Sequence, residues 1–199
     1  RIFTWIMVLS KKMKFNSLIS IARSLWINFR ATSRMHTIKE VPVSKSLNVS
    51  YLKIKDFSLA WKEHLKVFHT SISLSQFSLF FLFRRKLSFV LKNRQGEHIA
   101  YMFLYFNESE WKENCIHIGA LFLAEKFQGT GRAAMLEKFV LSYLSQNTTL
   151  SEVRARVTVE NENAYTLVLG NGFKVLSEYM DATIDKKRVY VTKSLRDDK

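Results

Sequence analysis

Residues 122–139 read FLAEKFQGTGRAAMLEKF, and this stretch places Gly129 and Gly131 between an apolar run and a helix-like pattern. The chain has only six glycines in 199 residues, so two of them two positions apart mark a special turn. A glycine turn at a helix N-terminus leaves backbone N–H groups free, and the helix dipole favours negative charge there. Glycine also lets an anion approach the backbone, because it has no Cβ. The stretch predicts either an ordinary tight turn or a phosphate-binding loop.

The segments around this loop have the periodicities of strands and helices. Apolar spacing predicts helices over 57–69, 73–85, 131–144 and 161–171, and apolar runs predict strands over 49–54, 87–93, 98–106, 115–124, 151–159, 173–180 and 187–195. We expect 115–124 to be buried on both faces, because nearly every position is apolar. Gly119 within it predicts a bulge or a close backbone approach.

Three motifs resemble those of the GNAT superfamily of acyl-CoA N-acyltransferases. Residues 128–133 (QGTGRA) match the family loop Q/R-x-x-G-x-G/A, residues 161–164 (NENA) match its N-x-x-A, and Gly172-Phe173 matches the Gly-Phe that opens the next strand. The resemblance covers about 49–195, with the elements in the same order. It implies an α+β fold, in which a mixed, mostly antiparallel central sheet is flanked by helices and split into a V.

The resemblance also implies acetyl-CoA as co-substrate, bound where strand 115–124 parts from strand 152–159. Backbone groups near Phe122 and Leu123 would pair with the pantetheine arm. Asn161 would hydrogen-bond the thiol arm, since its amide both donates and accepts. The loop would hold the pyrophosphate, chiefly through backbone amides, and its residues are Gln128, Gly129, Thr130, Gly131, Arg132 and Ala133.

The catalytic residues depart from the family pattern. Many GNAT enzymes carry a tyrosine seven residues after the motif asparagine, as general acid for the departing thiolate, and this chain has Val168 there. Tyr165, one helical turn earlier, is the candidate acid, and the alternative is an ordinary packed tyrosine. His117 and Glu113 are candidate bases, with Glu110 as a third. The charged run NESEWKEN (107–114) favours solvated glutamates, and His117 could equally be a satisfied core histidine.

The composition fits a globular domain, with 47% hydrophobic and 14% aromatic residues. The only cysteine, Cys115, excludes an intramolecular disulfide framework and is best explained as a small core residue; it favours a reducing compartment, so we expect a cytoplasmic protein. No apolar run approaches the roughly 20 residues of a membrane-spanning helix. Histidine and cysteine spacing predicts no metal site, and we expect no metal.

The net charge of +14 is uneven. Residues 1–39 hold eight Lys or Arg and no acid, which leaves 23 basic against 17 acidic side chains for residues 40–199. We treat 1–34 as a basic N-terminal extension and 35–199 as a single domain. The extension is a transit-peptide-like or membrane-surface segment, an extra helix packed on the domain, or sequence outside the natural protein, because Met35 opens an ordinary domain entry.

The sequence therefore predicts an N-acetyltransferase that moves acetyl from acetyl-CoA to a primary amine by direct attack in a ternary complex. One alternative is a catalytically weak or inactive GNAT-like domain that binds acyl-CoA, which Val168 favours. Another is a basic module for nucleic acid or a membrane surface, resting on residues 1–39. We expect no nucleic-acid partner, and a homodimer stays open because the family often dimerises.

Overall fold

The computed structural model describes residues 15–36, 38–68, 72–182 and 184–196. Short 3₁₀ turns cover Ile54–Asp56, Arg85–Leu87 and Glu125–Phe127. The helices and strands, in chain order, are α2 (Phe15–Arg34), β1 (Val41–Ser44), β2 (Leu47–Tyr51), α3 (Phe57–Phe68), α4 (Leu74–Leu82), β3 (Ser88–Asn93), β4 (His98–Tyr105), α5 (Glu108–Lys112), β5 (Cys115–Leu123), α6 (Arg132–Asn147), β6 (Glu152–Thr158), α7 (Glu162–Gly170), β7 (Lys174–Asp181) and β8 (Lys186–Ser194).

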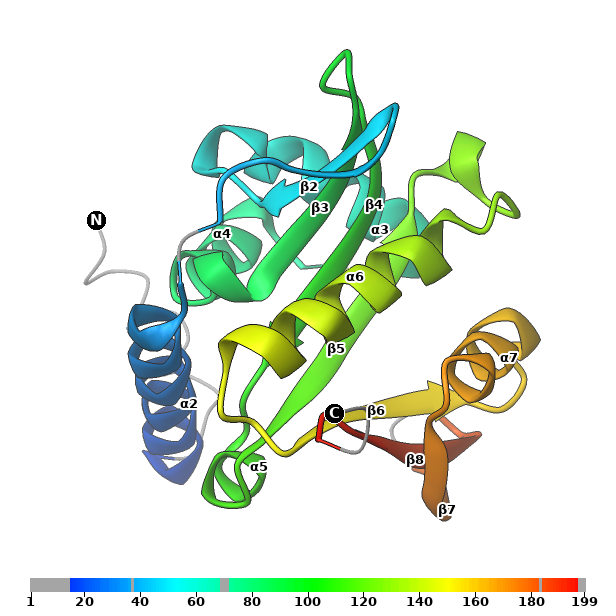
Figure 1. Cartoon of the computed structure of the whole chain (residues 1–199). Coiled ribbons are helices and arrows are strands. Elements are labelled where there is room, and N and C mark those ends of the chain that lie inside the picture. Colours follow the sequence, from blue (N-terminus) through cyan, green and yellow to red (C-terminus); the bar gives the residue numbers. More distant parts are fainter. Residues whose placement is uncertain (1–14, 37, 69–71, 183, 197–199) are drawn as a thin grey trace.

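The strands form one sheet in the order β1-β2-β3-β4-β5-β6-β8-β7. Only β5 and β6 pair in parallel, and every other neighbouring pair is antiparallel. The predicted α+β fold with a mixed, mostly antiparallel sheet is therefore confirmed. Helices cover both faces of this sheet (Figure 1).

The sheet splits in the middle, as the resemblance implies. Strands β5 and β6 pair only over Cys115–Ile118 and Glu152–Ala155. Beyond that point β5 continues along β4 as far as Leu123, and β6 continues along β8 as far as Thr158. The two strands visibly diverge in Figure 1, with α6 running alongside β5.

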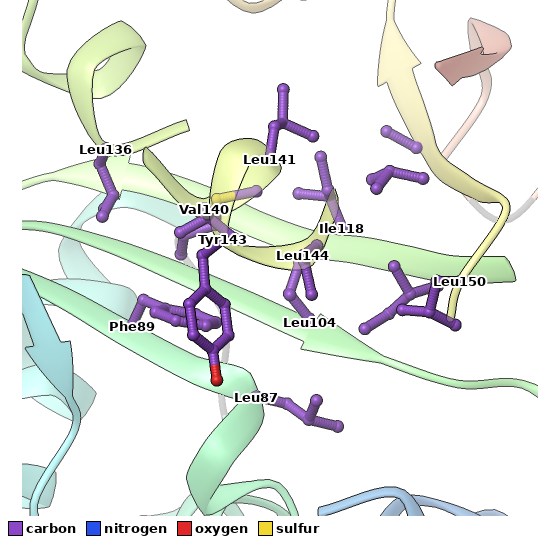
Figure 2. Close-up of a cluster of buried hydrophobic side chains, with 14 of the residues drawn as sticks. Leu87, Phe89, Leu104, Ile118, Leu136, Val140, Leu141, Tyr143, Leu144 and Leu150 are labelled. Carbon is purple, nitrogen blue, oxygen red and sulfur yellow. The ribbon is translucent and has the colours of Figure 1, made fainter. Parts of the chain in front are cut away.

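The main core lies between the sheet and α6. Leu136, Val140 and Leu144 recur at helical spacing on α6 and are all fully buried. Figure 2 shows this helix face over the strands, with Leu104 of β4 and Ile118 of β5 beneath it. A second cluster covers the opposite face under α3 and α4, and it is largely aromatic, with Phe77, Phe81, Tyr101, Phe103 and Phe122 among its members.

Several predicted elements differ from the structure. Strand β1, which contains Pro42, was not predicted; it lies on the sheet edge, where a proline is tolerated because edge N–H groups need no ladder bond. The first predicted strand, 49–54, begins earlier and ends at Tyr51, because a 3₁₀ turn follows. The prediction that 115–124 is buried on both faces holds only to Ile118, since Gly119 is exposed where the strands diverge.

Helix α2 packs on the domain through one buried stripe. Ile27 and Ala31 join the main core. Between them, the Asn28 amide donates to the Phe106 carbonyl at 2.9 Å and accepts from the Phe106 N–H at 2.9 Å. Residues 1–14 of the predicted extension lie outside the described residues, and the boundary at residue 34 stays a prediction. Among the described helices, none combines the length and apolarity that crossing a membrane requires.

Candidate active site

The glycine loop connects the end of β5 to the start of α6. Gly129 and Gly131 both have left-handed backbone conformations, with φ of 71° and 70°. Gly131 occupies the N-cap position of α6, so no side chain caps the helix there. A Cβ at either glycine would meet no atom within 4 Å, so the backbone conformation, not crowding, favours glycine. The exposed loop thus presents uncapped helix amides to an anion.

The loop's other residues complete this surface. The Thr130 hydroxyl donates to the Phe127 carbonyl at 2.5 Å, which ties the loop to the preceding turn. The Arg132 guanidinium lies 4.9 Å from the Phe127 ring centre. Gln128 is exposed, and Ala133 keeps the first turn of α6 small. Positive charge and free N–H groups therefore meet at one end of β5.

The free edge of β5 begins just before this loop. Ala124 donates to the Ile99 carbonyl at 2.9 Å, so the antiparallel alternation points the backbone groups of Leu121 and Leu123 away from β4. They face the side where the described part of β6 no longer pairs with β5. Phe122 lies between them, with its ring stacked on Tyr101 at 4.9 Å. This edge can accept an extended ligand as an added strand.

Asn161 lies across the opening, at the start of α7. Its side-chain oxygen accepts from the Ala164 N–H at 3.2 Å and caps the helix, while the residue stays exposed. Val168 is buried in the main core. Tyr165 is half-buried and packs against the same core.

His117 lies on the opposite face of β5 from α6, because Ile116 and Ile118 on either side of it are core residues. Its Nδ1 lies 2.7 Å from Glu110 Oε1, and both side chains are buried. The Tyr190 hydroxyl donates to the same Glu110 oxygen at 2.6 Å. A second Glu110 oxygen accepts from the Asn107 amide at 2.5 Å. The prediction that Glu110 is solvated was wrong.

The charge state of Glu110 fixes how His117 is oriented. Burial acts to raise the Glu110 pKa, but the hydrogen bonds and charges of His117, Tyr190 and Arg156 outweigh it and hold the pKa below its ordinary value. The ionised carboxylate can only accept, so His117 Nδ1 carries the proton. Within the described structure Nε2 has no hydrogen-bond partner, and it is not among the fully enclosed polar atoms that lack one. Nε2 is thus available as a base.

Glu113 lies close by but in a different environment. Its side chain is half exposed and accepts from Arg154 Nη1 at 2.5 Å. Arg154 also binds Glu152 on its own strand at 2.9 Å. The structure therefore brings His117 together with Glu110. It places Glu113 at the solvent-exposed edge of this site, and it packs Tyr165 against the main core. Among the described residues, no group of three His, Cys, Asp or Glu side chains is arranged to hold a metal ion.

Comparison with known proteins fits this geometry. The model of the acetyltransferase (GNAT) family matches residues 56–173, more than half of the chain. The chain belongs to the GNAT acetyltransferase family. The match spans the segment from the end of the first 3₁₀ turn to the Gly-Phe motif, so the glycine loop, His117 and Glu110 lie inside it, while Tyr190 follows it. No sequence match was found among curated proteins.

Solved structures share the fold at low identity. Spermidine N-acetyltransferase from Vibrio cholerae, in complex with CoA and spermine, aligns with a TM-score of 0.65 and 16% identity, over 76% of this chain and 97% of that one. The protein yncA from Salmonella typhimurium, solved with its cofactor acetyl-CoA, gives 0.64 and 12%, over 76% and 95%. The ribosomal-protein-S18-alanine N-acetyltransferase of Escherichia coli gives 0.60 and 14%, over 75% and 94%. This GNAT chain is therefore an acyltransferase by family and fold.

Proposed function

We propose that this GNAT protein transfers an acetyl group from acetyl-CoA to a primary amine by direct attack in a ternary complex. The observation that carries the proposal is a combination of two features. Pairing between β5 and β6 ends at Ile118 and Ala155, and the unpaired part of β5 leads to a loop with two left-handed glycines. An extended ligand with phosphates at one end fits this combination, because the strand edge and the helix amides are both unpaired.

The proposed cofactor-binding residues follow one another along the length of the extended ligand. The backbone of Leu123, with Leu121 and Phe122 beside it, lines the opening where the pantetheine arm would pair. The amides at Gly129, Gly131, Arg132 and Ala133 would hold the pyrophosphate, and Gln128 and Thr130 would complete the loop around it. Asn161 is exposed, and among the described contacts only its side-chain oxygen is engaged, as the cap of α7, so its amide N–H₂ can bind a ligand. We assign that group to the thiol arm.

His117 is the base we propose for the amine. Glu110 Oε1 lies 2.7 Å from His117 Nδ1 and keeps the proton on that nitrogen, which leaves Nε2 to accept a proton. The carboxylate also stabilises the imidazolium that forms, and Tyr190 anchors the carboxylate from the other side. The Arg154 ion pair holds Glu113 at the rim, where we propose a role in collecting the released proton.

Tyr165 is the proposed general acid, and its position supports a second candidate function. Val168 is buried and has no ionisable group that could donate a proton, and Tyr165 is a half-buried residue of α7. A chain that binds acyl-CoA with little turnover would have the same geometry. Turnover does not strictly need an acid here, because a thiol with a pKa near 8.5 leaves tolerably as thiolate at neutral pH.

Release of free thiol from acetyl-CoA, measured with a chromogenic disulfide over a panel of primary amines, separates the two candidates. The active enzyme predicts amine-dependent release that falls at least about 100-fold in His117→Gln. The control is His36→Gln, which changes an exposed histidine before β1. Amine-independent release, or equal rates in both variants, would contradict the proposed base.

A cytoplasmic location and a homodimer complete the proposal. Sedimentation at micromolar concentration tests the dimer, and a monomer with full activity would refute it.

A further inference from the structure

The face of the sheet that carries His117 also carries a group of arginines. On β6, Val153, Ala155 and Val157 point into the main core, so Arg154 and Arg156 point to the His117 side. The same alternation on β8 places Arg188 and Tyr190 there, because Val189 and Val191 are core residues. A pocket of about 520 Å³ opens on this face, and its lining includes Glu113, Arg154, Arg156, Tyr179, Asp181 and Tyr190.

Tyr105 lies between His117 and the point where the strands split. Its ring lies 4.8 Å from the His117 ring, centre to centre. The same ring occupies the space beside Gly119, where a Cβ would approach Tyr105 Cδ1 to 2.9 Å. Gly119 is the first residue of β5 beyond the paired segment. Tyr105 therefore lies where the proposed acetyl donor and its acceptor would meet.

Two arginines near Tyr105 and Tyr190 form no ion pair in the described structure, although the charge of Arg156 also acts on Glu110. The Arg84 guanidinium lies 5.0 Å from the Tyr105 ring centre, and its buried Nε has no hydrogen-bond partner. Burial lowers the Arg84 pKa to about 10, so the group stays charged at neutral pH. Arg156 lies 5.7 Å from the Tyr190 ring centre, and the described residues give it no ion pair.

The nearby carboxylates are already engaged. Glu113 and Glu152 bind Arg154, and Asp181 binds Arg188 at 2.9 Å. Glu110 accepts from His117 and Tyr190. The Tyr105 hydroxyl adds a neutral donor, because burial raises its pKa more than the surrounding arginines lower it. Apart from His117 Nε2, the site thus presents cationic and neutral donors, and the carboxylates named here already accept from other described side chains.

We infer that the amine acceptor carries an anionic group, a carboxylate or a phosphate, which Arg84, Arg156 and the Tyr105 hydroxyl bind beside His117; this rests on the proposed acetyltransferase function. A planar guanidinium binds either anion through paired hydrogen bonds. A polyamine such as the spermine of the Vibrio cholerae complex would instead place its positive charges against two arginines that form no ion pair among the described residues.

Matched amines test the inference on the full chain. β-Alanine against propylamine isolates the carboxylate, phosphoethanolamine against ethanolamine isolates the phosphate, and spermidine supplies the polycation. We expect the anionic member of a pair to have a kcat/KM about 10- to 100-fold higher, as one charge-assisted hydrogen bond provides. In Arg156→Gln this ratio should fall about tenfold or more, while Arg94→Gln, in the exposed β3–β4 turn, should leave it unchanged.

The outcomes distinguish a failure of this inference from a failure of the proposed function on which it rests. Failure of acetyl-CoA to bind in calorimetry would refute the proposed function itself. Binding with equal or better use of propylamine or spermidine would overturn only the anionic acceptor. If acetyl-CoA binds and no amine is acetylated, calorimetry of phosphoethanolamine decides: binding that Arg156→Gln weakens supports the inference, and no binding contradicts it.

Discussion

Glu137 is a carboxylate that the fold buries at a cost, and its removal should change how stability depends on pH. It lies on the core face of α6 and is fully buried. One oxygen accepts from the Asn171 amide, and the other has no hydrogen-bond partner among the described residues. Burial raises the Glu137 pKa to about 7, against the opposing effects of Asn171 and Lys193.

The magnitude follows from the difference between folded and unfolded chains. Below pH 4.5, the ordinary pKa of the group, Glu137 is protonated in both states and contributes nothing. As the pH rises from 4.5 to 7, the unfolded chain releases the Glu137 proton while the folded chain keeps it, so the free energy of unfolding falls. At about 1.4 kcal/mol for each pKa unit, the loss reaches about 3 kcal/mol and is constant above pH 7.

Urea unfolding of the wild type and of Glu137→Gln between pH 4.5 and 8 measures this loss. All other titrations cancel in the difference between the two curves. The free energy of unfolding of the variant should therefore rise by about 3 kcal/mol relative to that of the wild type between pH 4.5 and 8. Glu160→Gln, which changes an exposed glutamate, serves as the control and should run parallel to the wild type. Two parallel curves for Glu137→Gln as well would refute the buried carboxylate.

Three further substitutions test the fold and the site. Asn28→Ala leaves the Phe106 N–H and C=O without the partner that α2 gives them, so the free energy of unfolding in urea should fall by about 1–3 kcal/mol; no change would show that α2 does not dock. Val168→Tyr forces a large ring into the core, so the melting temperature measured by calorimetry should fall and the rate of thiol release should not rise; a faster enzyme would contradict the burial of Val168. Tyr165→Phe should slow thiol release below pH 8 more than above it, since only the thiolate leaves without an acid, and a uniform effect across pH would contradict the proposed acid role.

The sequence predicted those parts of the fold that depend on short-range signals. The loop around Gly131 and the asparagine at α7 are local motifs, so the residues themselves predicted a turn, a helix start and a strand before them. Gly119 was predicted as a bulge or a close approach, and the register does shift opposite it while Tyr105 fills its Cβ space.

The candidate base site was harder to predict, because its geometry depends on a short helix. The charged run 107–114 favoured solvent, yet α5 turns Glu110 inward. One signal was available: Asn107 is a favoured N-cap residue, and in the structure its side-chain oxygen accepts from the Glu110 N–H while its side-chain amide donates to the Glu110 carboxylate. The position of Arg84 beside Tyr105 follows from tertiary packing, which no local pattern predicts.

Calorimetric titration of acetyl-CoA into the full chain asks directly whether the glycine loop and the edge of β5 bind the cofactor. We expect micromolar binding that adenosine 3′,5′-bisphosphate shares in part, because both would place phosphates against the loop. Gly131→Asp puts a carboxylate on that loop and should abolish binding, while Gly131→Asn keeps the same left-handed backbone at 70° without the charge and should bind far better. A folded chain that binds no acetyl-CoA, or that binds it equally in both variants, would contradict the account.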